Sequence, residues 1–409
     1  MELSLRAFLT RILGIREVVV EDVSIEQESD EEAVVVRIRQ RQGRSPRCSR
    51  CGRRVAGVGH QARARRWRHL SMLGTATYLE AQVRRVYCPC TGSEQVEAVP
   101  WARAGARVTR SLERVVALLS RTTDTTTAAR HFELSWRTVS AIEGRYADEQ
   151  LVPARFDGLY AIGVDEISWG RGQRYLTVVV DLLQGDVIWI GKGRSQESLE
   201  AFFREIGPDR CAQLRVVATD LHHAFHVAVR RLAPQADLVF DHFHLVKLLN
   251  TALDDVRREE FRRLDQDERR WIKGTRWAVL KDPSHLTPSQ AQKLADLERT
   301  NQRLYRGYLL KEDFRHAWVP GNVGVSRTRL ARWLRWARRC RIRQIVRFAK
   351  TVQDHLDGIL KAVELRVSTG PVEGLNNKIK TILKRAYGFL NVDRFIRAIY
   401  FRCLRFEIT

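Results

Sequence analysis

Three acidic residues stand where metal-assisted chemistry could be carried out. Asp165 interrupts the apolar run AIGVDEIS, and Asp220 ends another, VVATD. Carboxylates that are brought together repel one another, so a cluster of them normally requires a cation. Mg²⁺ or Mn²⁺ prefers oxygen ligands, and two such ions suit the in-line displacement of a phosphodiester. A third carboxylate is needed to hold both ions, and Glu373 in GPVEGLNN is the best candidate.

The order of the elements around these acids predicts how they meet. Strand-like and amphipathic helical segments alternate in the order strand 159–168, strand 173–183, strand 186–193, helix 195–206, strand 214–220, helix 223–232 and strand 236–241. Three antiparallel strands followed by helix, strand, helix and strand is the order of an RNase H-like fold. In that fold the third acid lies on a helix after the fifth strand. A single aspartate at a strand end would otherwise be a turn or cap residue.

Two further residues follow the fifth strand. Asp241 and His244 in FDHFHLVK could order the site from a second layer, or could simply cap the following helix. Residues 243–366 contain no convincing strand and read as long basic helices. The closing segment is helical from Pro371, and Glu373 falls in its first turn, away from the apolar stripe.

Four cysteines indicate a second kind of site. Cys48 and Cys51 form a CxxC pair and Cys88 and Cys90 a CxC pair, both beside β-like segments (17–40 and 76–87). Zn²⁺ takes four tetrahedral nitrogen or sulfur ligands, and a CxxC turn supplies two of them. The compressed second pair leaves room for His60 or His69 as a substitute ligand, and for the alternative that these are small unpaired thiols.

Residues 111–148 read as helix, turn and helix. Ser135 is placed to cap the second of the two short helices, which carries Val139 and Ile142 inward. Such a recognition helix would present Trp136, Arg137 and Ser140 to a DNA groove. An ordinary helical hairpin has the same pattern.

The charge favours a polyanionic partner. Lys and Arg total 71 against 48 Asp and Glu, a net charge of +23. Residues 41–70 hold ten Arg and residues 326–350 nine Arg and one Lys, with no acid in either window. A GC-rich genome would explain the Arg excess but not this clustering, since solvated surfaces usually mix signs. The candidate DNA contacts outside the recognition helix are Arg335, Arg338, Arg339, Lys378 and Lys380.

Other properties place the chain inside the cell. No apolar run is long enough to span a membrane, and the first residues lack a cleavable leader. Seven cysteines, an odd number, fit a reducing compartment. We therefore expect a cytoplasmic protein with nucleic acid as its partner and no membrane association.

These motifs together resemble a known family. CxxC…CxC, GVDEIS, YLTVVVDL, VVATDLHHAF, FDHFHLVKLLN and GPVEGLNNKIKTILKRAYGF occur in the order found in DDE transposases of bacterial insertion sequences, in the group called IS-L-three. The resemblance implies that Asp165, Asp220 and Glu373 are the catalytic acids, holding Mg²⁺ or Mn²⁺. It implies that Asp241 and His244 match a D-x-x-H element of transposases with a helical insertion.

The resemblance also implies an activity. The expected function is binding of terminal inverted repeats, cleavage at the element ends and joining of the 3′-hydroxyl to target DNA by two-metal-ion chemistry. A homo-oligomer on DNA, associated with the nucleoid, is expected because two ends are cut together. Two alternatives stay open: a non-catalytic or domesticated DNA-binding protein, and a structure-selective nuclease on the same fold.

The expected fold is a multidomain α+β chain in which a helical insertion interrupts an RNase H-like core. Five parts are expected: a β-rich zinc-ribbon-like domain (1–105), a helix-turn-helix (106–150), the first part of the core (151–250), an all-helical basic insertion (251–366) and the last core helices with the third acid (367–409).

Overall fold

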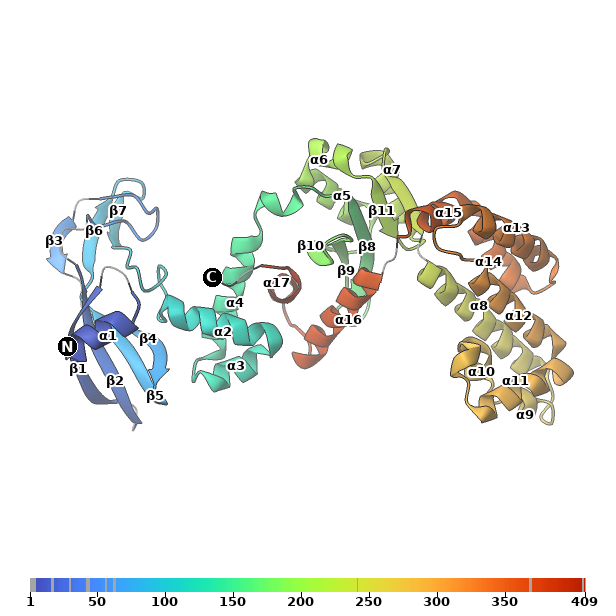
Figure 1. Cartoon of the computed structure of the whole chain (residues 1–409), viewed down its shortest axis with the longest axis horizontal. Coiled ribbons are helices and arrows are strands. Elements are labelled where there is room, and N and C mark those ends of the chain that lie inside the picture. Colours follow the sequence, from blue (N-terminus) through green and yellow to red (C-terminus); the bar gives the residue numbers. More distant parts are fainter. Residues whose placement is uncertain are drawn as a thin grey trace. The chain divides into compact units, whose positions relative to one another are not determined.

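The computed structural model of the chain describes residues 5–15, 18–28, 31–41, 45–55, 57–61, 64–240, 242–367, 370–406 and 408. The chain forms two compact units, Met1–Asp148 with Phe406–Thr409, and Glu149–Arg405 (Figure 1). The first unit contains two small sheets followed by three helices. The second unit combines a five-stranded sheet with a helical part. The chain is therefore a multidomain α+β protein.

The first unit begins with β-structure. Its elements are α1 (Leu5–Ile12), β1 (Val18–Glu28), β2 (Glu31–Gln40), β3 (Gly57–Gln61), β4 (Arg65–Met72), β5 (Thr75–Ala81), β6 (Arg84–Cys88) and β7 (Ser93–Val96). They form a sheet of order β1-β2-β5-β4 and a smaller sheet of order β3-β6-β7. The hairpin expected over 17–40 is confirmed. Its apolar faces pack around Val36, Leu79 and Trp67.

The strand expected over residues 76–87 is wrong as a single element. The chain leaves the first sheet after Ala81 and enters the second at Arg84. There the buried carboxylate of Glu97 accepts the Arg84 backbone N–H at 2.7 Å and also binds its guanidinium. Alternation of buried apolar residues continues past the end of β5, through Leu79, Ala81 and Val83. The sequence pattern therefore could not reveal the change of sheet.

Three helices complete this unit: α2 (Arg110–Thr122), α3 (Thr125–His131) and α4 (Trp136–Gln150). Each begins at a side chain that accepts a backbone N–H: Thr109, Asp124 and Ser135 respectively. Between α3 and α4 the chain turns at Glu133, which has a φ of 53°. The two short helices and their tight turn are those expected from the sequence.

The second unit holds a five-stranded sheet. Its strands are β8 (Ala161–Ser168), β9 (Tyr175–Asp181), β10 (Asp186–Lys192), β11 (Val216–Thr219) and β12 (Asp237–Phe240). Their order is β10-β9-β8-β11-β12, with the first three antiparallel and β11 parallel to both β8 and β12. All five strands lie where the sequence pattern predicts them, each within a few residues.

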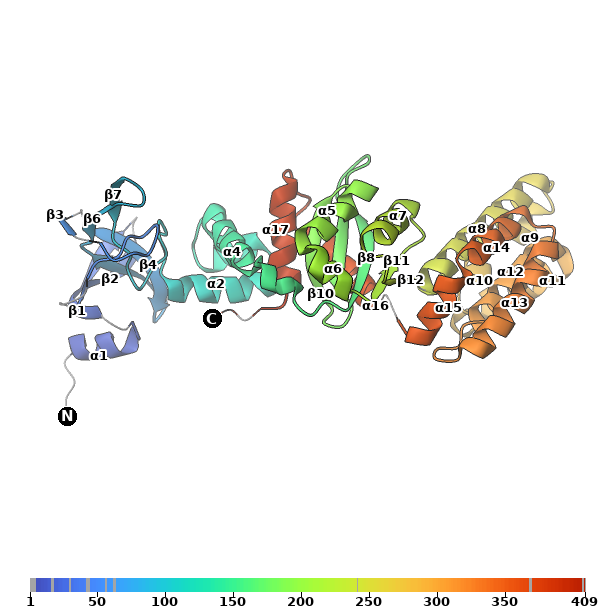
Figure 2. The ribbon, with the colours of Figure 1, turned by 90° about the horizontal axis from the view of Figure 1, so that it is seen from above.

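Helices cover both faces of this sheet (Figure 2). On one face, α5 (Gln196–Ile206), α6 (Pro208–Gln213) and α7 (His223–Leu232) pack on a core that contains Ile162 and Val164. On the other face, α16 (Gly370–Arg385) contacts β8 and α17 (Val392–Cys403) contacts β10. Because side chains alternate along a strand, Gly163 and Asp165 face α16.

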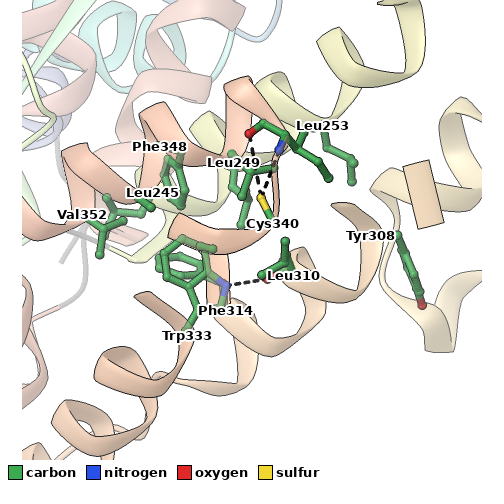
Figure 3. Packing of buried hydrophobic residues seen from close by; sticks show 14 of the residues in the cluster. Leu245, Leu249, Leu253, Tyr308, Leu310, Phe314, Trp333, Cys340, Phe348 and Val352 are labelled. Carbon is green, nitrogen blue, oxygen red and sulfur yellow. Dashed lines mark hydrogen bonds between the residues drawn. The ribbon is translucent and has the colours of Figure 1, made fainter. Parts of the chain in front are cut away.

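The rest of the second unit is helical. Its elements are α8 (His242–Arg263), α9 (Arg269–Ile272), α10 (Arg276–Leu280), α11 (Pro288–Thr300), α12 (Gln302–His316), α13 (Val323–Arg339), α14 (Arg343–Asp354) and α15 (Leu356–Leu365). Figure 3 shows the core between them, where Trp333 packs on Phe314 and Phe348 and donates its indole N–H to the Leu310 carbonyl at 2.7 Å. No strand interrupts 242–366 in the described residues, as expected. Of the helices described, none has the length and apolarity to cross a bilayer.

Candidate functional site

Asp165 and Asp220 meet through the register of two neighbouring strands. Val164 on β8 pairs with Thr219 on the parallel strand β11, so Asp165 is the next residue of β8 and Asp220 is the first residue after β11. Adjacent strands lie about 4.8 Å apart, so the register brings the two residues side by side where β11 ends. In this arrangement the Asp220 charge acts on the Asp165 carboxyl.

Several groups surround the Asp165 carboxyl. Burial raises its pKa, and the neighbouring Asp220 charge raises it further. The backbone N–H of Glu166 donates to Asp165 Oδ1 at 2.7 Å, and Nδ2 of Asn376 donates to Oδ2 at 2.5 Å. These hydrogen bonds, together with the nearby His244, favour the ionised form and oppose the rise. The carboxyl is thus held in one orientation by α16 and by its own strand.

Helix α16 reaches this site because a glycine lets it approach the sheet. A Cβ on Gly163 would lie 2.4 Å from Cγ2 of Val372 and 2.9 Å from Cδ2 of Leu182. Val372 is buried, Glu373 next to it is exposed, and Asn376 one turn later is buried against Asp165. The first turn of α16, with Glu373, therefore lies beside the two aspartates.

The three acids do not form a closed group. Within the described part of the chain, the one set of three His, Cys, Asp or Glu residues whose ligand atoms all lie within 4.8 Å consists of cysteines. Two carboxylates that follow paired residues of neighbouring strands, with a third on an exposed helical turn, are nevertheless a donor set that divalent cations prefer. Asn376 Oδ1 is buried and has no protein partner, which is a further unused oxygen at the same place.

Histidines line the opposite side of the aspartates. Asp220 Oδ1 accepts the backbone N–H of His222 at 3.0 Å, and its carbonyl lies 2.9 Å from Nε2 of His226. His244, in the first turn of α8, is close enough for its charge to act on Asp165. The Nδ1 atoms of His222 and His244 are buried without a protein partner. Asp241 lies outside the described residues.

Three of the four predicted cysteines gather in the first unit. The sulfur atoms of Cys48, Cys51 and Cys88, which we call the thiol cluster, lie within 4.8 Å of one another, and Cys51 and Cys88 are 3.4 Å apart. The Cys48–Cys51 turn is closed by Gly52, whose φ is 70° and whose N–H donates to the Cys48 carbonyl. Cys88 is the last residue of β6, and residues 89–92 form the turn to β7. A tight turn and the end of a strand therefore bring the three thiols together.

The surroundings of the cluster favour the thiolate form of Cys88 and oppose that of Cys51. Burial opposes ionisation of Cys88, but contacts with the Cys51 and Cys48 thiols and with two backbone N–H groups lower its pKa to about 6. The N–H of Arg53 lowers the pKa of Cys51, whereas the thiols around it raise it to about 11. The thiol of Cys90, which is exposed, also contacts Cys51. Cys90 is therefore close enough to the cluster to supply a fourth ligand.

Of the two histidines considered as substitute ligands, the structure describes the side chain of His69. His69 is buried in β4, where Nδ1 lies 2.8 Å from the hydroxyl of Thr109, so the expectation that it replaces a thiolate is wrong. Its pairing with the N-cap of α2 joins the sheet to the helices instead. The side chain of His60 lies outside the described residues.

The expected DNA-contacting residues are mostly at the surface. Trp136 and Arg137 are exposed at the start of α4, and Ser140 is half-buried. Arg335, Arg338 and Arg339 are exposed on α13, with Arg338 donating to Gln353 at 3.2 Å. Lys380 is exposed on α16, whereas the Lys378 ammonium is bound to the Arg402 carbonyl of α17.

Asn376 is the functional residue that sequence reasoning overlooked. It follows Glu373 by three residues, so on a helix it lies next to the acid but turned toward the buried face. An amide on the apolar stripe of a helix is a usable signal, since a buried polar group needs a partner. Asp165 is that partner.

Comparison with known proteins agrees with these features. The sequence model of a family described as transposase, of the ISL3 group, matches residues 162–399. A model for the zinc finger of the transposases IS204/IS1001/IS1096/IS1165 matches residues 44–90, and one for the helix-turn-helix domain of transposase family ISL3 matches residues 97–147.

Two curated relatives are similar over most of their length. The transposase for insertion sequence element IS1557 of Mycobacterium tuberculosis is 36% identical over 406 residues, which cover 92% of this chain and 91% of the relative. The transposase for insertion sequence element IS1001 of Bordetella parapertussis is 32% identical over 355 residues, or 86% of this chain and 87% of the relative.

Proposed function

Because the chain belongs to the ISL3 family of DDE transposases, we propose that it binds the terminal inverted repeats of its element, cleaves the ends and joins the freed 3′-hydroxyl to target DNA. One observation carries this proposal: Asp165 lies within β8, Asp220 directly follows the neighbouring parallel strand β11, and the helix that bears Glu373 contacts Asp165 through Asn376. The sheet order, with three antiparallel strands followed by two parallel ones, supports an RNase H-like core.

Asp165, Asp220 and Glu373 would hold the divalent metal, Mg²⁺ or Mn²⁺. Their oxygens and the unpaired Oδ1 of Asn376 suit a hard cation, and the repulsion between two like charges is relieved by one. When bound, such an ion polarises the phosphate and stabilises the leaving oxygen. Asp165 lies on β8, Asp220 directly after β11 and Glu373 on α16, so binding of ions would draw the first turn of α16 toward the two aspartates.

The remaining groups position these acids and the substrate. Asn376 and the Glu166 N–H fix the Asp165 carboxyl, and the N–H of His222 fixes that of Asp220. His244 faces the same carboxylates with an unused Nδ1, which can donate to a phosphate oxygen. Asp241 is proposed to support His244.

DNA recognition is assigned to the other elements. The first turn of α4, with Trp136, Arg137 and Ser140, would enter the major groove. The exposed arginines of α13 (Arg335, Arg338 and Arg339) and Lys378 and Lys380 of α16 would contact phosphates. The thiol cluster, with Cys90, would bind Zn²⁺ and stabilise the ribbon. Domain boundaries at 105, 150, 250 and 366 are proposed, with assembly as a homo-oligomer on DNA at the nucleoid.

The test is cleavage and joining of DNA that carries the sequences flanking the gene. We expect Mg²⁺- or Mn²⁺-dependent nicking at the element end and joined products with target DNA. Asp165→Ala, Asp220→Ala and Glu373→Ala should each lose cleavage but keep binding. Binding without cleavage under either metal would favour the non-catalytic DNA-binding protein. Cleavage without joined products would favour the nuclease.

A further inference from the structure

A stripe of exposed side chains runs along α16 and into the turn after it. Glu373, Asn377, Lys380, Lys384 and Tyr387 follow one another at intervals of three or four residues, and all five are exposed. Such spacing places the first four, which belong to α16, on one face of the helix, and Tyr387 follows in the turn after it. The buried residues of α16 lie on the other side. The third acid is therefore at one end of a line of exposed groups that ends at an aromatic ring.

The turn at the end of this line presents two apolar side chains to solvent. Residues 386–391, which we call the α16–α17 turn, include Tyr387 and Leu390, with exposed fractions of 101% and 107%. Tyr387 also has a φ of 51°, in the left-handed region. A bulky residue there costs conformational energy, and strain of this kind is typical of functional positions.

The backbone of this turn is firmly held. The N–H groups of Tyr387 and Gly388 donate to carbonyls of the last turn of α16, both at 3.0 Å. Asn391 caps α17, and the ring of Phe389 packs on that of Phe395 with centroids 4.9 Å apart. One aromatic residue of the turn thus serves the protein core. The side chains of Tyr387 and Leu390 point to solvent, and the hydrogen-bonded backbone of the turn keeps them there.

The charge around the turn selects its partner. Residues 378–397 contain six basic residues and one acid, Asp393, which is paired with Lys192 at 2.7 Å. The ammonium groups of Lys380 and Lys384 are exposed on the stripe. A second copy of this chain, at +23, would be repelled from such a surface, whereas the DNA backbone would be attracted.

We propose that this stripe lies along duplex DNA, with Lys380 and Lys384 on phosphates and Tyr387 and Leu390 inserted as a wedge at one base step. Apolar wedges of this kind unstack and kink DNA. The inference rests on the proposed function, since it places Glu373 at the cleaved bond. Twelve residues at a rise of 1.5 Å each span about 18 Å from Glu373 to the end of α16, and Tyr387 lies two residues further on, so the wedge falls roughly five to six base pairs of 3.4 Å from Glu373.

The experiment maps unstacked bases on the same DNA that is cleaved. The full chain is bound to duplexes copied from the flanks of the gene, in Mg²⁺, and probed with permanganate, which oxidises unstacked thymine. Substitution of 2-aminopurine for adenine covers steps that lack thymine. We expect reactive bases about five to six base pairs from the cut. Tyr387→Ala and Leu390→Ala should abolish them and weaken binding by about five-fold to a hundred-fold.

The chain offers a matched control. Leu183 lies at the tip of the β9–β10 turn of the same unit and is 68% exposed, but it stands between Asp181 and Asp186. Leu183→Ala should change neither binding nor base reactivity. Tyr387→Phe should keep the unstacking. Tyr387→Gly should remove it while the melting temperature stays the same or rises, because glycine tolerates the positive φ.

The outcomes separate this inference from the proposed function. If the wild type cleaves DNA without unstacking a base, or if Tyr387→Ala and Leu390→Ala leave the unstacking unchanged, the wedge is wrong and the transposase proposal stands. If the wild type neither binds nor cleaves, the proposed function fails and the wedge with it. If the variants reduce self-association without DNA and leave unstacking unchanged, the turn contacts a second copy, which overturns the wedge.

Discussion

The thiol cluster and the carboxylate site reach their spacing in different ways. Cys48, Cys51 and Cys88 lie within 4.8 Å because a tight turn and the end of a strand in the first unit bring them together. Asp165, Asp220 and Glu373 come from two strands and a distant helix, and they are not drawn together to that degree. Neutral thiols can gather without a cation, but carboxylates repel. The fold therefore brings the three thiols together without a metal ion, whereas the three carboxylates are placed near one another but are not gathered into a closed group.

This difference predicts opposite consequences for loss of a ligand. Removing a thiol should weaken the fold of the first unit, since structural zinc contributes folding free energy. Removing a carboxylate should abolish activity while the second unit stays folded or becomes more stable. The predictions below test this contrast, from the largest expected effect to the smallest.

The first prediction concerns Asp165→Asn. Cleavage of DNA that carries the element end should fall by about a thousand-fold or more. Catalytic residues that act as a unit depend on one another, so loss of one removes most of the rate enhancement of the whole set. The melting temperature should be unchanged or higher, because the substitution removes one of two repelling charges and keeps an oxygen that can accept from Asn376. Cleavage assays and calorimetry check both parts.

Its matched control is Glu166→Gln. Glu166 is the next residue of β8 but binds Arg194 at 3.2 Å on the opposite face of the sheet. Cleavage should stay within a few-fold of wild type. A large fall in stability for Asp165→Asn would show that the carboxylate serves the fold, contrary to the comparison.

The second prediction concerns Cys48→Ser. The variant should lose the bound zinc and roughly 3–5 kcal/mol of stability, the range expected when a structural site is broken. Metal content by atomic emission and urea unfolding measure the two effects. Cys211→Ala is the control, because Cys211 is a buried lone thiol of the second unit and its loss should leave the zinc content unchanged. Equal zinc in wild type and Cys48→Ser would refute the assignment.

Local patterns in the sequence predicted most of the fold. The five strands of the second unit follow from apolar runs, and Gly185, with a φ of 71°, lies in the turn between β9 and β10. Ser135 caps its helix as expected, and Ser195 caps α5 in the same way. What could not be predicted depends on the third dimension: the change of sheet after Ala81 and the pairing of His69 with Thr109.

The carboxylate site was accessible to sequence reasoning only in part. The proximity of Asp165 and Asp220 follows from the strand order, since they come after paired residues of the parallel neighbours β8 and β11. The approach of α16 depends on Gly163, which reads as an ordinary strand residue until Val372 is seen against it. The hydrogen bond from Asn376 to Asp165 spans more than two hundred positions and has no local signal of its own.

The third prediction concerns a loss of stability of the first unit at low pH that comes from His69 and not from release of zinc. Burial lowers the pKa of His69 to about 4, against an unfolded value of 6.5. Between these values the unfolded chain binds a proton that the folded chain does not, so stability is lost as pH falls from about 6.5 to 4. The loss is about 3 kcal/mol at most. Urea unfolding of chelated protein at pH 7 and 4.5 should show it, and His69→Asn should remove this component of the pH dependence.

The fourth prediction concerns the approach that positions the third acid. Gly163→Ala places a methyl group 2.4 Å from Val372 Cγ2, so α16 must move or strain must be accepted, at a cost of about 1–3 kcal/mol. Cleavage should fall with it, because Glu373 and Asn376 lie on the displaced turn. The double variant Gly163→Ala/Val372→Ala should recover part of both losses in unfolding and cleavage assays.

Gly374→Ala is the control on the same helix. A Cβ there has no neighbouring atom within 4 Å, and alanine favours a helix over glycine by about 1 kcal/mol, so stability should rise. The pair distinguishes two accounts of the carboxylate site. If Gly163→Ala lowers stability but leaves cleavage intact, α16 is free to settle around the metal by itself. If cleavage falls and Val372→Ala restores it, the fold fixes where the third acid stands, and only the last closure is left to the cation.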